Sequence, residues 1–239
     1  MDKMLKIADR VVGDNHPVFV IAEIGLNHNG KLELAKKMVK AAKESGADAV
    51  KFQKRDLKSL YKKDVYENPN KDSQSTSYLF GIFKKFELSK KDFIELKKYC
   101  EHLGIIFFCT PFDIKSAEFL SHLDVPVYKI SSADLTNIPL IDFIISKKKP
   151  LILSTGMSQI PEIDFTYKFL KKKKADFSFM HCVSTYPTAF KDVNLKMIEF
   201  LKNRYRVPIG YSGHERGIII AIGATTLGAK IIEKHFTLN

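Results

Sequence analysis

The chain carries two histidines near its end whose surroundings suit metal-assisted chemistry. His235 stands two residues after Glu233 in the short apolar run 230–236, which is rich in β-forming residues and is predicted to be a buried strand. Because side chains alternate between the two faces of a strand, Glu233 and His235 share one face. His214 follows the preceding predicted strand. Two imidazoles at adjacent strand ends can hold a divalent cation and leave positions for water and a substrate oxygen, as in Lewis-acid sites.

Two other predicted strands each contain a lysine on the face that would point into the barrel. Lys51 lies in the strand 49–53 and Lys129 in the strand 127–131. A lysine inside a barrel is costly unless an anion meets it, because an unpaired buried charge loses much of its hydration energy. Each lysine alone is equally well explained by a stem packed on the barrel with its head in water, but the pair favours binding of phosphate and carboxylate. Hydroxyl groups stand at neighbouring strand ends: Thr110, Ser132, Ser154, Ser184 and Ser212.

These residues need a scaffold that brings strand ends together, and the order of the predicted elements indicates one. Eight strands alternate with helices and begin near residues 19, 49, 105, 127, 151, 177, 208 and 230. Strict alternation means parallel pairing, and eight units favour a closed (β/α)8 TIM barrel over an open doubly wound sheet, whose G-x-G-x-x-G turn is missing. No strand hairpin is expected. Further polar residues stand at these strand ends, where a barrel has its active-site mouth: Glu23, Gln53, Asp134 and Tyr186.

The longest connection between predicted strands begins at Lys54. Residues 54–86 lack sustained periodicity and are rich in Lys, Asn, Ser and Tyr. Connections of this length in compact domains are usually functional covers or disordered segments. We therefore expect an irregular segment of one of these two kinds.

Composition narrows the class of protein. The 239 residues are 45% hydrophobic and 28% charged, which is ordinary for a globular domain. The net charge of +12 comes mostly from lysines spread along predicted helices, without an Arg-rich arm, so we expect neither a nucleic-acid nor a membrane partner. Three scattered cysteines indicate a reducing compartment, and residues 1–10 lack the apolar core of a signal peptide, which together predict a cytoplasmic protein.

Seven stretches resemble the N-acetylneuraminate (sialic acid) synthase family, which includes legionaminate and pseudaminate synthases. Two are IAEIGLNHNG at 21–30 and HCVSTYP at 181–187, and the others lie at 47–53, 129–132, 153–157, 210–214 and 233–238. Together they cover the whole predicted barrel in order. The resemblance implies condensation of phosphoenolpyruvate with an N-acetylated amino sugar, N-acetylmannosamine or a related one. The products would be a nine-carbon acid and inorganic phosphate, and Mn²⁺ or Mg²⁺ would assist.

The resemblance also implies a role for each matching residue. His214 and His235 match the metal ligands. The expected catalytic residues are Glu23, Lys51 and Lys129, with Glu23 moving a proton or holding the attacking water. Positions near the sugar and the reacting carbons are matched by Glu23, Gln53 and Tyr186. Contacts to phosphoenolpyruvate are matched by Lys51, Thr110, Lys129, Ser132, Ser154 and Ser212.

Three positions depart from the family. Asp134 stands where members often have Glu, Ser184 where many have Asn, and Gly213 where one branch has Asp. Asp134 and Ser184 remain expected substrate contacts, but the departures leave open how sugar and phosphate are held there.

Family members continue past the eighth strand with a further acid, a last helix and an antifreeze-like C-terminal domain that caps the neighbouring site in a dimer. Residues 1–239 are expected to form the barrel domain alone, ending before the eighth helix, and the full-length form is expected to be a homodimer. The chain by itself would then bind phosphoenolpyruvate but turn it over slowly. Two alternatives stay open. One is a legionaminic or pseudaminic acid synthase that uses a 2,4-diacetamido hexose, and the other is a truncated barrel that acts as a non-catalytic partner or remnant.

Overall fold

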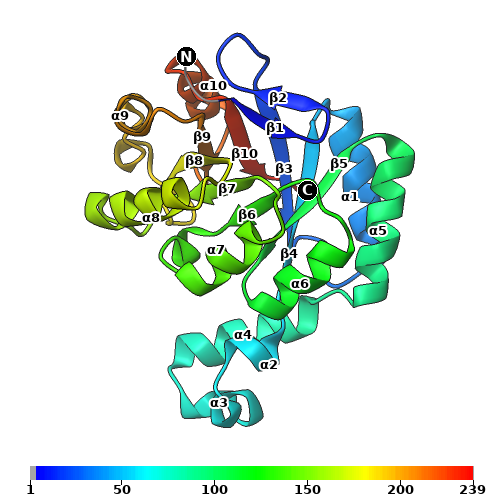
Figure 1. The fold of residues 1–239 in the computed structure, drawn as a ribbon. Helices are drawn as coiled ribbons and strands as arrows, with labels where there is room; N and C mark the ends of the chain where they lie inside the picture. Colours follow the sequence, from blue (N-terminus) through cyan, green and yellow to red (C-terminus); the bar gives the residue numbers. More distant parts are fainter. Residues whose placement is uncertain (1–3, 239) are drawn as a thin grey trace.

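The computed structural model describes residues 4–238, except the side chain of Ser75, and its centre is a closed barrel of eight parallel strands (Figure 1). Helices connect successive strands, so the predicted (β/α)8 TIM barrel is confirmed. The strands follow one another around the barrel in chain order: β3 (Phe19–Gly25), β4 (Ala49–Lys54), β5 (Ile106–Pro111), β6 (Tyr128–Ile130), β7 (Leu151–Ser154), β8 (Phe177–Cys182), β9 (Ile209–Gly213) and β10 (Ile231–His235).

The last strand closes the barrel because β10 pairs with β3 on one side and with β9 on the other. Each barrel strand starts within one residue of its predicted position. The predicted parity also holds in β4, where Val50 and Phe52 are fully buried between strand and helices while Lys51 faces the barrel interior. Because side chains alternate between the two faces of each strand, the polar residues lie on the inner face, at the carboxyl ends of the barrel strands.

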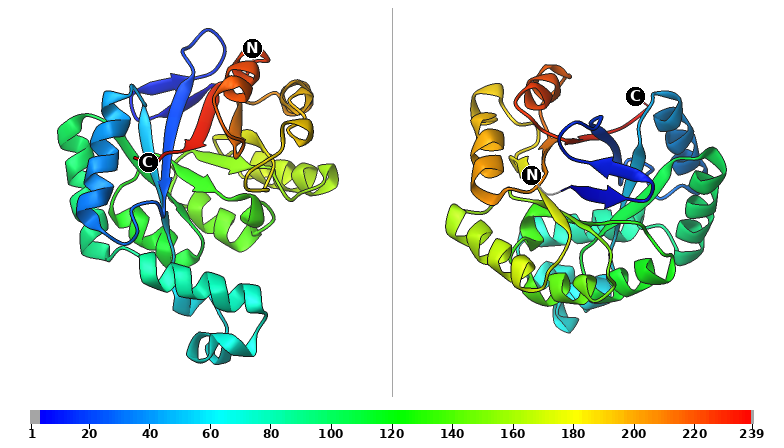
Figure 2. Two further views of the ribbon diagram at one scale, coloured as in Figure 1. Left: turned by 180° about the vertical axis from the view of Figure 1, so that it is seen from behind. Right: turned by 45° about the horizontal axis from the view of Figure 1, so that its top comes forward.

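Helices pack around the outside of the barrel (Figure 2). In the first of them, Ala35, Met38, Val39 and Ala42 form a buried stripe at helical spacing. None of the helices within residues 4–238 is long and apolar enough to cross a bilayer. Short 3₁₀ turns, η2 (Ser132–Asp134) and η3 (Phe190–Asp192), follow β6 and β8. The outer helices are α1 (Leu32–Glu44), α5 (Lys90–Leu103), α6 (Ile114–His122), α7 (Ile138–Ile145), α8 (Ile160–Lys172), α9 (Lys196–Tyr205) and α10 (Ile219–Thr226).

The connection after β4 is helical, so the expectation of an irregular segment is wrong. Asp56 and Ser73 accept hydrogen bonds from backbone N–H groups three residues on and begin two of its helices. Phe80 is buried against the edges of the Tyr61 and Tyr66 rings. This α2–α4 segment, residues 55–88, projects beyond one end of the barrel (Figure 1). It consists of α2 (Leu57–Leu60), α3 (Lys63–Glu67), η1 (Pro69–Lys71) and α4 (Gln74–Phe86).

A hairpin precedes the barrel, which corrects the expectation that the chain has none. β1 (Leu5–Ile7) pairs antiparallel with β2 (Arg10–Val12). Leu5, Ile7 and Val12 are buried. The hairpin lies across the barrel end opposite the α2–α4 segment (Figures 1 and 2). The hairpin therefore covers the barrel at the amino-terminal ends of its strands and leaves the carboxyl ends open for the site.

Close contact between β9 and β10 depends on a glycine. A Cβ added at Gly210 would lie 2.8 Å from both the Cβ and the carbonyl oxygen of Ile231. We expect Gly210→Ala to lower the free energy of unfolding by about 2 kcal/mol or more, because two paired strands must separate. Gly81 lies in α4 with nothing within 4 Å of an added Cβ. As the matched control, Gly81→Ala should instead stabilise by up to about 1 kcal/mol. Urea unfolding measures both, and a Gly210→Ala variant as stable as the parent would contradict the expectation.

Candidate active site

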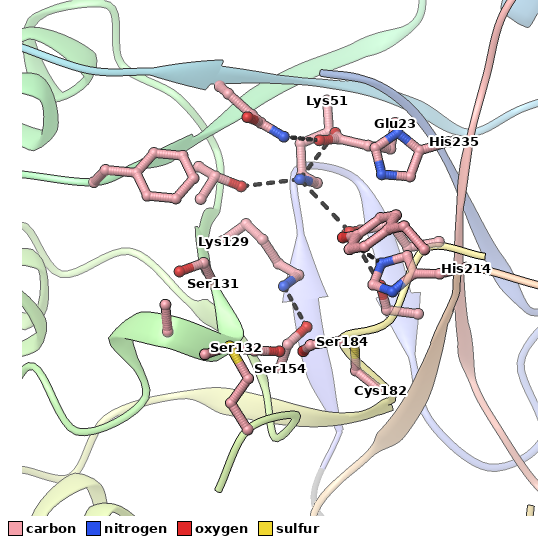
Figure 3. Close-up of a pocket in the computed structure, with 18 of the residues that line it drawn as sticks. Glu23, Lys51, Lys129, Ser131, Ser132, Ser154, Cys182, Ser184, His214 and His235 are labelled. Atoms are coloured by element: carbon pink, nitrogen blue, oxygen red, sulfur yellow. Dashed lines mark hydrogen bonds and ion pairs between the residues drawn. The ribbon is translucent and has the colours of Figure 1, made fainter. Parts of the chain in front are cut away.

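A cavity of about 460 Å³ opens where the barrel strands end (Figure 3). Its volume is within the range of small-molecule sites, about 300–1,000 Å³. Of the predicted site residues, only Asp134 does not line it. The cavity brings together all the others: Glu23, Lys51, Gln53, Thr110, Lys129, Ser132, Ser154, Ser184, Tyr186, Ser212, His214 and His235.

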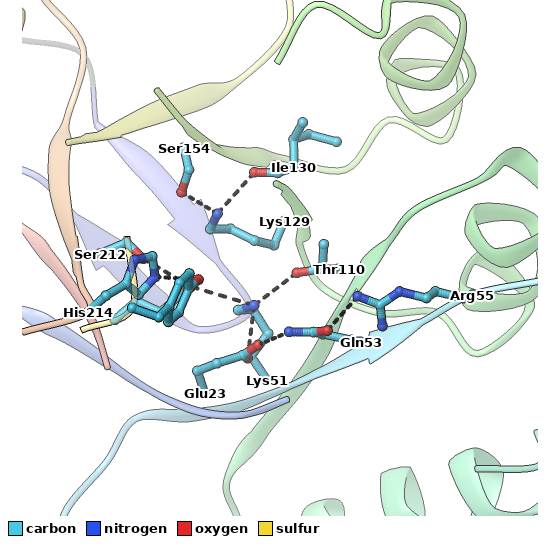
Figure 4. Close-up of polar contacts among 12 residues, drawn as sticks. Glu23, Lys51, Gln53, Arg55, Thr110, Lys129, Ile130, Ser154, Ser212 and His214 are labelled. Carbon is cyan, nitrogen blue, oxygen red and sulfur yellow. Dashed lines mark hydrogen bonds and ion pairs between the residues drawn. The ribbon is translucent and has the colours of Figure 1, made fainter. Parts of the chain in front are cut away.

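Lys51 is the centre of a buried charge cluster (Figure 4). Its Nζ lies 2.9 Å from Glu23 Oε2 and 3.5 Å from Glu233 Oε1, and it donates a hydrogen bond of 2.9 Å to Thr110 Oγ1. Burial acts to lower the pKa of Lys51, but the two carboxylates outweigh it and raise that pKa above its ordinary value. Gln53 Nε2 donates to the other oxygen of Glu23 at 2.8 Å. The lysine is therefore a fixed cation that holds two carboxylates in the barrel mouth.

Lys129 differs from Lys51 because no carboxylate neutralises it. Its Nζ donates to Ser154 Oγ at 2.5 Å and to the carbonyl oxygen of Ile130 at 3.0 Å. Among the described residues, no carboxylate oxygen lies within 4 Å of this amine. Burial lowers the pKa of Lys129, and the charge of Glu233 opposes that shift only in part. A buried ammonium that lacks a counter-ion and faces a cavity is suited to bind an anion.

Two serine hydroxyls converge beside Lys129 because of a glycine. A Cβ at Gly156 would lie 2.5 Å from Ser184 Oγ and 2.7 Å from Ser132 Oγ, so only glycine fits between them. Asp134 lies next to this region without entering the cavity. It accepts hydrogen bonds from Ser131 Oγ at 2.7 Å and from Asn137 Nδ2 at 3.1 Å. In this structure Asp134 thus fixes the turn that carries Ser132.

His214 is held in one orientation by hydrogen bonds on both ring nitrogens. Nδ1 lies 2.7 Å from the carbonyl oxygen of Val183, which can only accept, so Nδ1 carries the proton. Nε2 then has a free lone pair, to which the Tyr186 hydroxyl donates at 2.8 Å. The Tyr186 ring stacks on His214 at 3.9 Å, and the His235 ring centre lies 5.8 Å from that of His214. Burial lowers the pKa of His214, which keeps its imidazole neutral at physiological pH.

The donor atoms around the two histidines fit a divalent cation in an open site. Within residues 4–238 no three His, Cys, Asp or Glu side chains are already gathered as a ligand set. The imidazoles of His214 and His235 supply two nitrogen donors. Beside them Glu233, whose pKa is lowered despite burial by the charges of Lys51 and Lys129, has a buried oxygen, Oε2, without a hydrogen-bond partner. The remaining positions around a cation would be left for water and substrate oxygen.

Sequence reasoning missed one wall of the cavity. Arg55 lines it with Leu79, Phe83 and Phe112. The central carbon of the Arg55 guanidinium lies over both phenylalanine rings, 4.1 Å from the centre of Phe83 and 3.8 Å from that of Phe112. Arg55 follows Lys51 and Gln53 at the same two-residue spacing, so the parity of β4 was a signal that could have identified it. Phe83 gave no such signal, because the fold of the α2–α4 segment was not predicted.

The fold and the cavity together define a TIM-barrel domain with a buried lysine, Lys129, and a histidine pair at the carboxyl ends of its strands. A model of the NeuB family matches residues 38–239, and the chain belongs to that family.

Similar proteins include both sialic and legionaminic acid synthases. The human N-acetylneuraminate-9-phosphate synthase is 41% identical over 232 residues, which are 96% of this chain and 65% of that protein. The N,N'-diacetyllegionaminic acid synthase of Legionella pneumophila is 43% identical over 95% of this chain and 66% of its own length. The chain thus spans slightly under two-thirds of these relatives. Among solved structures, the N-acetylneuraminic acid (sialic acid) synthetase of Leptospira borgpetersenii in complex with citrate is similar, with a TM-score of 0.89 and 38% identity. The superposition covers 100% of this chain and 80% of that chain.

The two buried lysines should respond to removal with opposite signs. Lys51→Met leaves the carboxylates of Glu23 and Glu233 together without their cation, and we expect it to lower the free energy of unfolding by about 3–5 kcal/mol. Lys129→Met removes a charge whose lowered pKa means that protonation at neutral pH costs stability, so it should stabilise by about 1 kcal/mol. Denaturant unfolding at pH 7 measures both. Destabilisation by Lys129→Met would show that its charge is compensated in the folded state.

Proposed function

We propose that the chain is the barrel domain of a sialic-acid-type synthase, which condenses phosphoenolpyruvate with an N-acetylated amino sugar to a nine-carbon acid and inorganic phosphate. The observation that carries the proposal is the uncompensated ammonium of Lys129 beside the hydroxyls of Ser154, Ser132 and Ser184. Phosphate and carboxylate groups are the ligands that such an arrangement binds. Membership of the NeuB family supports the same reading.

In this reaction carbon 3 of phosphoenolpyruvate bonds to the aldehyde carbon of the open-chain sugar, water adds to carbon 2, and phosphate leaves. Lys129 and Ser154 hold the phosphoenolpyruvate anion, while Lys51 and Thr110 face it from β4 and β5. Glu23, oriented by Lys51 and Gln53, is placed to hold the attacking water or to move its proton. His214 and His235 would hold Mn²⁺ or Mg²⁺, which supplies Lewis-acid polarisation of the aldehyde oxygen when bound.

The identity of the amino sugar is the open part of this proposal. The human relative is named for a 9-phosphate product and the Legionella relative for a diacetylated one. When a nine-carbon acid is built from a three-carbon and a six-carbon substrate, carbon 9 of the product is carbon 6 of the sugar. The relatives therefore differ in acyl groups and in a phosphoryl group at the sugar's far end.

Metal-dependent phosphate release tests the reaction directly. With phosphoenolpyruvate and Mn²⁺, we expect phosphate to appear only when an amino sugar is added, and Lys129→Gln to raise the KM for phosphoenolpyruvate by about tenfold or more. The panel contains N-acetylmannosamine and 2,4-diacetamido hexoses. Turnover of N-acetylmannosamine alone excludes the legionaminic and pseudaminic alternative. Binding of phosphoenolpyruvate without release of phosphate with any sugar would favour the non-catalytic alternative.

Binding of Mn²⁺ should persist into mildly acidic solution. Protons compete with metal for the imidazole lone pairs, and burial lowers the pKa of His214 below its usual 6.5. Protonation of His214 should therefore weaken binding only as the pH drops below 6.5 toward its lowered pKa. Calorimetry from pH 5 to 8 measures this. His235→Ala should weaken binding at all pH values, whereas the exposed His102→Ala should leave it unchanged; a loss centred at or above pH 6.5 would contradict the assignment.

A further inference from the structure

We propose that Arg55 binds a phosphoryl group at the far end of the amino sugar, so that this site prefers a phosphorylated sugar over its neutral counterpart. The inference rests on the proposed function and concerns its substrate class. Arg55 is the first residue after β4 and lines the cavity with only 7% of its surface exposed.

The guanidinium of Arg55 has few partners in the structure. Nη2 donates to Gln53 Oε1 at 2.7 Å, while Nη1 has no hydrogen-bond partner. Within residues 4–238, no carboxylate oxygen lies within 4 Å of the guanidinium nitrogens, and the Glu87 carboxylate accepts a hydrogen bond of 3.5 Å from the backbone N–H of Arg55. The central carbon of the guanidinium lies over the Phe83 and Phe112 rings, which supply only the weak attraction of their π-electrons. Most of its five N–H donors thus remain available in the plane of the group.

A guanidinium in this position is a buried cation whose strongest attraction is to the Glu87 carboxylate, and that carboxylate already pairs with Lys54. Burial lowers the pKa of Arg55 to about 10, so the group is still charged at neutral pH. Leaving such a charge unpaired is unfavourable, and a phosphoryl group offers the oxygens that match the planar fork of an arginine. The two rings and the hydrogen bond to Gln53 restrict the side chain before any ligand arrives, which reduces the entropy lost on binding. The contacts are therefore those of a recognition group rather than of a solvated surface arginine.

Phosphoenolpyruvate is not the best partner for Arg55. Its anionic groups have Lys129 and the nearby serines, which come from β6, β7 and the loops after β6 and β8. Arg55 lies beyond Gln53 as seen from Lys51, away from Lys129 and Ser154 (Figure 4). A sugar whose aldehyde lies near Glu23 and the histidines would extend past Gln53, and its last carbon would approach Arg55. The acidic group expected there is one carried by the sugar.

Binding measurements test this inference without requiring turnover. The probes are N-acetylmannosamine and its 6-phosphate, titrated calorimetrically with phosphoenolpyruvate present and no metal added. We expect the parent chain to bind the phosphorylated sugar at least about tenfold more tightly than the neutral one. Arg55→Gln should weaken binding of the phosphorylated sugar by about 10–100-fold and leave the neutral sugar nearly unchanged. Arg55→Lys should retain part of the preference, because it keeps the charge but loses the fork.

A matched control separates a local contact from a general charge effect. Lys84 is exposed on α4 and does not line the cavity, so Lys84→Gln removes one positive charge nearby and should change neither affinity. Equal binding of both sugars by the parent chain, or an equal loss of both in Arg55→Gln, would overturn the inference. So would a changed KM for phosphoenolpyruvate with unchanged sugar affinities. Absence of phosphate release with either sugar would count against the proposed synthase reaction only, because the calorimetric preference still decides the role of Arg55.

Discussion

The barrel mouth depends on the ion pairing of one buried lysine with two carboxylates. Lys51 on β4 lies against Glu23 on β3 and Glu233 on β10, and β3 and β10 are the strands that close the barrel. Closure and charge pairing therefore support each other. With Lys129 included, the formal charges of these four groups sum to zero. A substrate that brings phosphate and carboxylate makes the pocket negative, so groups outside the cluster must balance it. In the proposed reaction these are the cation at the histidines and, for the sugar, Arg55.

Strand register explains how separate parts of the sequence reach one another. Opposite positions in neighbouring ladders are His235 and Glu23, Glu23 and Lys51, and Gln53 and Thr110. Each of these side chains points to the barrel interior, because strand parity is shared around the ring. The groups that the proposed chemistry needs are thus adjacent through backbone pairing, and side-chain hydrogen bonds only adjust their final orientation.

Sequence patterns were sufficient for the barrel and for most of its mouth, because parallel strands with alternating parity produce strong periodic signals. They were insufficient where structure is short or local. The hairpin β1–β2 consists of three-residue strands, which carry too little periodicity to identify. In the α2–α4 segment, α2 and α4 each start at a single polar cap, Asp56 and Ser73. Arg55 has the two-residue spacing from Gln53 that predicts a place in the barrel mouth. Its aromatic neighbours, Phe83 in that segment and Phe112 after β5, could not be predicted from that spacing. Asp134 lies in the turn η2 after β6, where hydrogen bonds to Ser131 and Asn137 hold its carboxylate away from the cavity.

The α2–α4 segment lets the pocket wall vary independently of the barrel, although both tasks usually fall to the same residues in a compact enzyme domain. Its own aromatic cluster of Tyr61, Tyr66 and Phe80 holds it together, and its extensive contacts are among its own elements rather than with the barrel. Of its described residues, Arg55, Leu79 and Phe83 line the cavity. Changes of length or sequence in this one excursion can therefore reshape the pocket wall while the eight strands keep their register. Divergence among relatives that act on different acceptors would then concentrate in a single surface module, with the ring of charges beneath it left intact.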